Sequence, residues 1–290
     1  MTIHRLRYWH KFTQLRLTQN MRVADGNIEW CNFLLAVGEG RLPDDENHKI
    51  MLPDGVVQVN NLDEMVAAIY GSPIDPELFQ DRAILAPKNV DVDRINTLIM
   101  DKFEGEERIS TSIDSVEDDS QNKYPMELFL NSLRLNDTPP HRLMLKVGSI
   151  VMCIRNVNKP AGLTNGTRVR VTKLYPNMTG GIIVTEGSFR GKPIIIPRIK
   201  LSPSDSTLPF TFQRLQLPVR PAFVMTINKS QCQTLQKIGL FTENGSDIFS
   251  HGQAYVALSR ASQGPSGIVV FNSRITNIVY REFSTLNHIT

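Results

Sequence analysis

The sequence predicts an α/β fold that is interrupted by a small β-barrel, and three stretches of the chain support this. Residues 82–87 (RAILAP) form an apolar run typical of a buried strand, and a helix is expected after it at 92–103. Apolar strands return from residue 222 onwards. Between 145 and 218, short β-rich runs are separated by turn residues at spacings of roughly 10–15 residues, which is typical of a small barrel.

The other elements are expected from hydrophobic spacing and turn residues. Trp30, Leu34 and Val37 indicate a helix at 28–37, which Gly38 and Gly40 end. A helix at 62–70 is expected to begin at a cap formed by Asn60 or Asn61, and Asn89 or Asp91 is expected to cap the helix at 92–103. In chain order, the remaining expectations are helix then strand at 9–22, loop with a short strand at 41–59, an acidic solvated loop at 104–124, strands at 149–154, 167–172, 181–184 and 193–196, a helix at 230–237, a strand at 238–241, a helix at 252–259 and a strand at 267–271.

The charge of the chain is strongly asymmetric although its net value is only +3. Residues 1–145 contain 15 Lys and Arg against 24 Asp and Glu, which gives −9, whereas residues 146–290 contain 17 against 5, which gives +12. A basic half of this size indicates a polyanionic partner, most often nucleic acid, with an accident of surface composition as the equally weighted alternative.

Composition also excludes several classes of protein. There is no run of 18 apolar residues, so we expect no membrane span, and the first residues lack the apolar stretch of a secretory signal. Three separated cysteines and the absence of CxxC or HExxH patterns argue against a disulfide framework and a metal site. We therefore expect a reducing compartment, either the cytosol or the nucleus.

A phosphate-binding P-loop is absent from the sequence. The pair Gly191-Lys192 is followed by Pro193 instead of the Ser or Thr that begins a P-loop helix. The acidic residues 44–46 lack the apolar strand that would hold a magnesium-binding carboxylate beside a nucleotide. We expect that this chain does not bind and hydrolyse a nucleotide by itself in the P-loop manner.

Two segments in the basic half contain side chains suited to phosphate chemistry. Residues 226–231 (TINKSQ) follow an apolar strand, and ligands of open α/β sheets bind at such strand ends. Arg260 lies just past the helix expected at 252–259, where it can neutralise charge on a transferring phosphoryl group. Taken singly, the first segment is more often a polar helix cap, and a surface arginine is the usual interpretation of Arg260.

In combination, residues 226–235 (TINKSQCQTL) and 253–261 (QAYVALSRA) resemble motifs five and six of superfamily-1 helicases. The resemblance is closest to the Pif-type branch, which includes the helicases of Helitron mobile elements. Supporting segments occur in the expected order: 17–22 (LTQNMR) resembles motif four, 33–40 (FLLAVGEG) the helix after it, 84–89 (ILAPKN) through Asn96 the next strand and helix, and 139–143 (PPHRL) through 162–167 (GLTNGT) the start of the family's inserted barrel. The resemblance covers nearly the whole chain.

The resemblance implies the second RecA-like motor domain of a P-loop-NTPase-type fold, with an inserted Src-homology-type β-barrel. The implied division is a first RecA-like segment at 1–140, the barrel at 141–217 and a second RecA-like segment at 218–290. ATP and Mg²⁺ would be bound mainly by an N-terminal P-loop domain of the same or a separate chain. The implied location is the nucleus, or the cytosol if the chain is not eukaryotic, and the implied processes include DNA repair and recombination.

The same resemblance assigns roles to individual residues. Arg22 and Arg260 would contact the γ-phosphate of ATP, with Arg260 as the arginine finger, and Gln231 and Cys232 would lie near the same phosphate. The residues implied to contact the backbone of single-stranded DNA are Thr226, Asn228, Lys229 and Ser230, together with the weaker candidates Lys88 and Asn89.

Cys232 departs from the pattern because the family usually has glycine at this position. If the backbone here requires a positive φ, a side chain costs on the order of 1 kcal/mol and weakens the coupling of ATP to DNA. Three readings follow: the C-terminal motor half of a 5′→3′ DNA helicase that binds single-stranded DNA, a non-catalytic single-stranded DNA-binding remnant of a mobile-element helicase, or a protein-interaction barrel on an inert scaffold.

Overall fold

The computed structural model describes residues 8, 11–13, 15, 27–116, 127–133, 135, 138–203, 208, 210–242 and 247–280. The segment that resembles motif four, with Arg22, and the helix and strand expected at 9–22 lie outside the described residues, apart from isolated positions.

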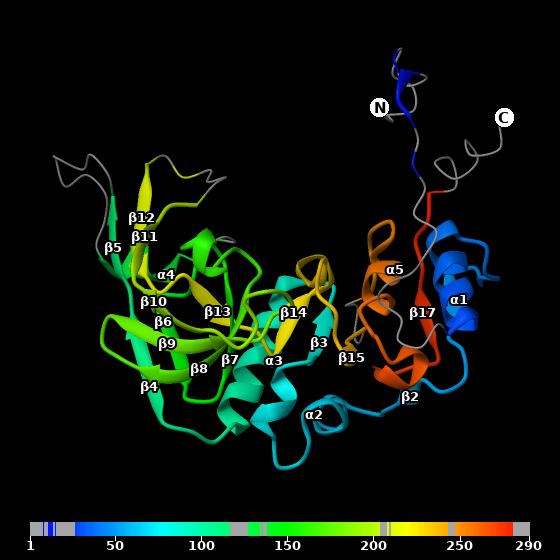
Figure 1. Ribbon diagram of the computed structural model, residues 1–290, viewed down its shortest axis with the longest axis horizontal. Coiled ribbons are helices and arrows are strands. Elements are labelled where there is room, and N and C mark those ends of the chain that lie inside the picture. The colour runs from blue at the N-terminus through cyan, green and yellow to red at the C-terminus, as the bar shows by residue number, and fades with distance from the viewer. Residues whose placement is uncertain are drawn as a thin grey trace.

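A five-stranded parallel sheet forms the α/β part of the molecule, in the order β14-β3-β15-β16-β2. Its strands, in chain order, are β2 (Val57–Gln58), β3 (Arg82–Ala86), β14 (Val224–Thr226), β15 (Lys237–Leu240) and β16 (Ile268–Val270). The helices of this part are α1 (Ile28–Glu39), α2 (Leu62–Tyr70), α3 (Asn89–Lys102) and α5 (Gln253–Leu258), and α1 lies outside α5, as Figure 1 shows. A two-stranded antiparallel pair, β1 (Lys49–Met51) with β17 (Arg274–Thr276), lies beside α1.

Local sequence explains how these helices begin and end. The Asn61 side chain accepts a hydrogen bond from the Glu64 N–H and caps α2, as expected from the sequence, and Gly40 ends α1 in a left-handed conformation. The cap expected for α3 is wrong, because α3 begins at Asn89 and its cap residue is Lys88, whose side chain makes no capping hydrogen bond.

The helix expected at 230–237 is also wrong. The structure has a single 3₁₀ turn, η6 (Ile227–Ser230), and then an irregular segment that leads into β15. Cys232 has a φ of 66°, a left-handed conformation that no α-helix accommodates.

The insert is built around a second sheet, which is antiparallel and has the order β10-β9-β8-β7-β13. Its strands are β7 (Ile150–Cys153), β8 (Arg168–Leu174), β9 (Met178–Ile183), β10 (Pro193–Pro197) and β13 (Val219–Pro221). Val151, Val169 and Val219 belong to a hydrophobic core of its own. The insert also contains a two-stranded sheet, a three-stranded sheet and a helix. The two-stranded sheet pairs β4 (Glu107–Thr111) with β6 (Arg142–Lys146), and the three-stranded sheet has the order β11 (Ile199–Leu201), β12 (Phe212–Gln216) and β5 (Ile113–Val116). The helix is α4 (Glu127–Ser132).

The loop expected at 104–124 is therefore wrong over residues 107–116. The acidic side chains of this segment indicated a solvent-exposed loop, but every second side chain points inward. Ser110 and Ser112 are buried while their neighbours are exposed. Because β4 pairs with β6 and β5 with β12, strand pairing extends the insert from Glu107 to Pro221. The division of the chain into domains remains a prediction, with wider limits than 141–217.

Two buried cationic side chains of the insert donate hydrogen bonds to backbone carbonyls of the parallel-sheet part. The Arg168 guanidinium, 2% exposed, donates to the carbonyls of Phe79 (2.8 Å) and Arg82 (2.9 Å). Lys146 Nζ donates to the Met100 and Phe103 carbonyls at the end of α3, at 2.9 and 2.8 Å. Burial lowers the pKa of Arg168, and the carbonyls replace the water that its guanidinium has lost.

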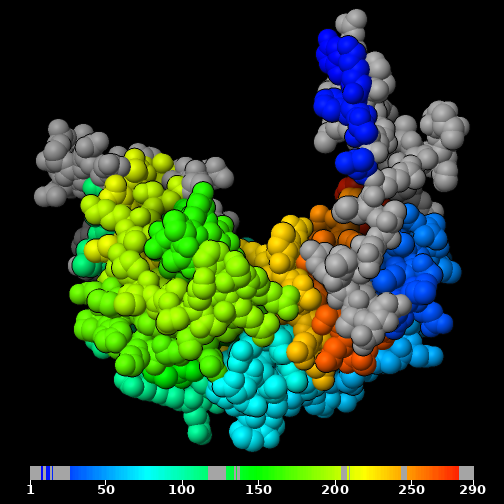
Figure 2. Space-filling view, in the orientation of Figure 1, coloured from blue at the N-terminus to red at the C-terminus, as the bar shows by residue number. Residues whose placement is uncertain are grey.

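The two parts also share apolar contacts, since Ile150, Met152 and Val184 of the insert belong to the large core of the parallel sheet. A hollow opens between the insert and the part of the molecule that contains α1 and α5 (Figure 2). The segment after β14 lies at the floor of this hollow. In the described part of the chain, no helix is both long and apolar enough to cross a membrane.

Candidate nucleic-acid and nucleotide interface

The predicted DNA-binding residues meet at one end of the parallel sheet. β14 and β3 are parallel neighbours, and Thr226 is the register partner of Ala86. The segments after these strands therefore lie side by side, with Lys88 and Asn89 after β3 and Asn228 after β14. This edge is the ligand-binding edge of open α/β sheets.

The η6 turn divides the predicted set into exposed and buried side chains. Thr226 Oγ1 accepts a hydrogen bond from the Lys229 N–H at 3.3 Å, and Ser230 Oγ donates to the Ile227 carbonyl at 2.6 Å. Ser230 is fully buried, whereas Asn228 and Lys229 are exposed. The hydroxyls of Thr226 and Ser230 thus shape the turn, and Asn228 and Lys229 face solvent.

Arg260 joins the two motif segments. It is only 4% exposed, and its Nη1 donates to the carbonyls of Gln233 (3.1 Å) and Ser230 (3.5 Å). Nε donates to the Val256 carbonyl at 3.0 Å, and Nη2 to Ser259 Oγ at 2.8 Å. The guanidinium is thus directed between α5 and the segment after η6, so it is not the surface arginine that the sequence alone left open.

Gln231 and Cys232 are exposed beside this contact. The φ of 66° at Cys232 shows that the position does require the left-handed region. For a residue with a Cβ atom, this conformation costs about 1–2 kcal/mol.

Asn96 is a site residue that the sequence did not single out for a role. Its side chain, 4% exposed, bonds both backbone groups of Val224: Nδ2 donates to the carbonyl at 2.9 Å, and Oδ1 accepts from the N–H at 3.0 Å. β14 is the edge strand of the sheet, and this amide takes the place of the missing neighbouring strand. The available signal was a polar residue between Ile95 and Ile99 on the apolar face of α3.

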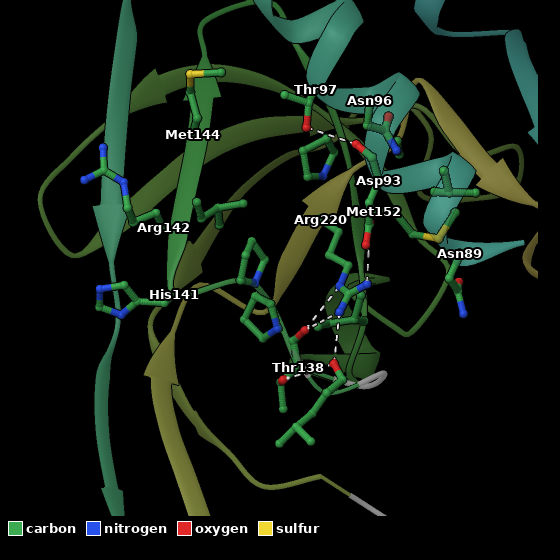
Figure 3. Close-up of a pocket in the computed structure, with 18 of the residues that line it drawn as sticks. Asn89, Asp93, Asn96, Thr97, Thr138, His141, Arg142, Met144, Met152 and Arg220 are labelled. Carbon is green, nitrogen blue, oxygen red and sulfur yellow. Dashed lines mark hydrogen bonds and ion pairs between the residues drawn. The ribbon is translucent and has the colours of Figure 1, made fainter. Parts of the chain in front are cut away.

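A cavity of about 580 Å³ lies between α3, the edge strand β14 and the insert. Figure 3 shows residues of α3, β6 and β7 together with Arg220 around it. Asn89, Thr226 and Lys229 belong to its lining, so the cavity adjoins the predicted DNA-binding edge. Its other walls come from residues distant in the chain, which is why no sequence motif indicated it.

Two of the described residues suit the phosphate end of an ATP site. An arginine and a glutamine can donate hydrogen bonds to phosphate oxygens, which fits Arg260 and Gln231. Within the described ranges, no three His, Cys, Asp or Glu side chains gather as metal ligands.

Comparison with known proteins supports the sequence resemblance. A family model of the DNA helicase Pif1 2B domain matches residues 128–174, from α4 into β8. The human ATP-dependent DNA helicase PIF1 is 33% identical over 127 residues, covering 41% of this chain and 18% of the relative. The ATP-dependent DNA helicase Pif1 of Bdellovibrio bacteriovorus is 25% identical over 249 residues, 86% of this chain and 48% of the relative.

Solved structures show the same fold. The crystal structure of Pif1 helicase from Candida albicans has a TM-score of 0.61 at 23% identity and covers 98% of this chain and 63% of its own. Pif1 helicase from Bacteroides in complex with ADP-AlF3 and ssDNA has a TM-score of 0.60 at 21% identity, covering 94% and 55%.

The parallel sheet with its inserted β-barrel therefore has the RecA-like fold found in these helicase structures. In sequence and in fold the chain is similar to Pif1-type DNA helicases. It spans about half the length, or less, of the curated relatives described above.

Proposed function

We propose that the chain is the C-terminal motor half of an ATP-dependent 5′→3′ DNA helicase that binds single-stranded DNA. In this proposal Arg260 is the arginine finger of an ATP site, which an N-terminal P-loop domain of the same or a separate chain completes. That domain binds most of the ATP and the Mg²⁺. The observation that supports the proposal is the Arg260 guanidinium, which contacts the Ser230 and Gln233 carbonyls beside the turn that exposes Lys229.

The DNA side of the site tracks the phosphate backbone. Lys88 and Lys229 are exposed cations on neighbouring segments, and Asn89 and Asn228 add amide donors beside them. Contacts of this kind do not depend on base sequence and weaken with added salt.

The nucleotide side is coupled to the DNA side through one turn. A γ-phosphate that competes for the Arg260 guanidinium draws it from the carbonyl of Ser230, the last residue of η6, and from that of Gln233, three residues further on. Because η6 holds Lys229, nucleotide and DNA then share a structural element whose shape both ligands influence. Gln231 and Cys232 border this contact, where we place them near the γ-phosphate. We also propose that Arg22 contacts the γ-phosphate, and this role rests on the sequence resemblance alone.

Single substitutions in the protein that includes the P-loop domain test this proposal. Lys229→Ala is expected to weaken single-stranded DNA binding several-fold and to reduce the slope of log K against log salt by about 1. Arg260→Ala is expected to lower DNA-stimulated ATP hydrolysis by about 10³-fold or more while DNA binding persists. Lys102→Ala, at the opposite end of α3 from Lys88, is the control and changes neither. Unchanged ATP hydrolysis in Arg260→Ala would refute the assignment of the arginine finger.

A second candidate function is a non-catalytic single-stranded DNA-binding remnant of a mobile-element helicase. The left-handed backbone of Cys232 favours it, because a residue with a Cβ atom occupies a position suited to glycine beside the Arg260 contact. Cys232→Gly should raise ATP hydrolysis in the complete enzyme if the side chain impairs coupling. Equal rates in both proteins would count against this explanation.

Location and process are proposals that rest on the resemblance alone. They are the nucleus for a eukaryotic chain or the cytosol otherwise, and a role in DNA repair and recombination. A Helitron element as the source is a proposal of the same standing.

A further inference from the structure

We infer that the cavity beside α3 holds one unstacked base of the bound DNA strand, while the phosphate next to that base stays at the exposed edge. This inference rests on the proposed function, since it assumes that single-stranded DNA crosses the ends of β3 and β14. It adds a binding site for a base to a surface that otherwise contacts only the backbone.

The cavity has the position and depth that a base requires. Asn89, Thr226 and Lys229 stand at the end that adjoins the predicted DNA edge, and the lining continues along α3 as far as Met100. Met100 lies eleven positions after Asn89 in the helix, which corresponds to about 16 Å. The volume of about 580 Å³ lies within the usual range for sites that enclose small ligands.

The cavity wall is unusually rich in methionine. Met100, Met144, Met152 and Met225 all line it, from α3, β6, β7 and β14 respectively, and they are four of the ten methionines in the chain. Thioethers contact aromatic rings favourably and adapt to their shape. A wall of this kind accepts purines and pyrimidines alike, which suits an enzyme that moves along any sequence.

Arg220 supplies a fixed planar group in the same space. Its Nε donates to the Thr138 carbonyl at 3.2 Å and its Nη2 to the Leu135 carbonyl at 3.1 Å. Figure 3 shows the guanidinium between Thr138 and Asp93, and Nη1 lies 3.9 Å from Asp93 Oδ1. A guanidinium held in this way can stack on a base.

Charge at the cavity favours a nucleotide in one orientation. Lys229 at the DNA-side end is cationic, and the carboxylate of Asp93 is offset by Arg220. The apolar methionine wall lies further inside. A nucleotide with its base directed inward and its phosphate outward therefore matches both regions.

The test compares two strands of equal length, oligothymidylate and a fully abasic strand, which keeps the phosphates and lacks the bases. The protein is again the complete helicase. Met144→Trp fills the cavity from the insert side without changing the residues at its DNA-side end. Met178→Trp, an exposed methionine on β9 that does not line the cavity, is the matched control.

We expect Met144→Trp to weaken oligothymidylate binding by about 5- to 100-fold, the effect of losing one stacked base, and to leave abasic binding unchanged. Met178→Trp should bind both strands as the unmodified protein does. Equal binding of oligothymidylate by both variants would overturn the inference, as would an equal loss on both strands in Met144→Trp.

A second measurement does not depend on the folding of any variant. A strand with 2-aminopurine at successive positions should brighten at one position when the unmodified protein binds, because that base leaves its neighbours. If the strand binds and no position brightens, the inference fails while the proposed function stands. If the unmodified protein does not bind either strand, the proposed function itself fails.

Discussion

Asn96→Ala tests whether one buried amide holds the DNA-binding edge in place. Asn96 joins α3, which begins at Asn89, to β14, which ends at Thr226. In the alanine variant both the N–H and the carbonyl of Val224 lose their partners, at a residue that is 1% exposed. A buried polar group without a partner costs about 1–3 kcal/mol, so the two groups together cost about 2–6 kcal/mol. Water that enters from the adjoining cavity would bring the cost toward the lower end.

Asn96→Asp separates the two hydrogen bonds. The carboxylate still accepts from the Val224 N–H, but its second oxygen faces the Val224 carbonyl, to which the amide donates in the unmodified protein. We expect destabilisation in urea unfolding for both variants, together with weaker single-stranded DNA binding under conditions where each variant remains folded. Asp101→Ala, an exposed position on α3 that does not line the cavity, is the control. A loss below about 0.5 kcal/mol in Asn96→Ala, within the range of ordinary surface changes, would refute the reasoning.

Three further predictions concern strain, a buried ion pair and a buried thiol. Cys232→Gly should raise the urea concentration at the midpoint of unfolding. The relief of left-handed strain, about 1–2 kcal/mol, exceeds the stabilisation of the unfolded chain by the added freedom of glycine, about 0.4–1 kcal/mol. A lower midpoint would contradict this. Asp114→Asn should cost about 3–5 kcal/mol in the same assay, because it removes the carboxylate paired with the Arg214 guanidinium in an ion pair whose side chains are both 0% exposed and leaves that charge to backbone carbonyls. Asp63→Asn, in an exposed pair, should change little. Burial raises the pKa of the Cys153 thiol from 9.0 to about 12, so this thiol ionises at lower pH in the unfolded chain than in the folded protein. The contribution of the buried thiol to stability is therefore full below pH 9 and is lost as the pH rises towards 12. Cys153→Ala should make the fall in stability over this pH range less steep. An unchanged pH profile would show that the thiol does not contribute.

Elements with a single strong local signal were predictable. α2 was expected at its observed residues, because its apolar spacing and an asparagine cap agree. β3 and α5 were likewise expected close to their observed positions. These segments specify their own conformation, and tertiary packing confirms it.

The misses have physical causes in particular residues. β4 and β5 are acidic on their exposed side, so composition indicated a loop although Ser110 and Ser112 point inward. The helix expected after Ser230 failed because Thr226 closes a short turn and Cys232 takes a left-handed conformation. In each case a long-range partner or a single backbone angle outweighed the local pattern.

By itself, the sequence determined the α/β class, the presence of a β-rich insert and the two motif segments, because these depend on periodicity and on residue order. Only the tertiary structure decided which motif side chains face solvent. Lys229 and Asn228 do, while Ser230 and Arg260 are buried against backbone carbonyls. It also created the methionine-lined cavity, since four distant segments form its walls only after the insert packs against α3. The burial of these side chains and the proximity of these segments arise from tertiary packing, so no local sequence pattern predicts them.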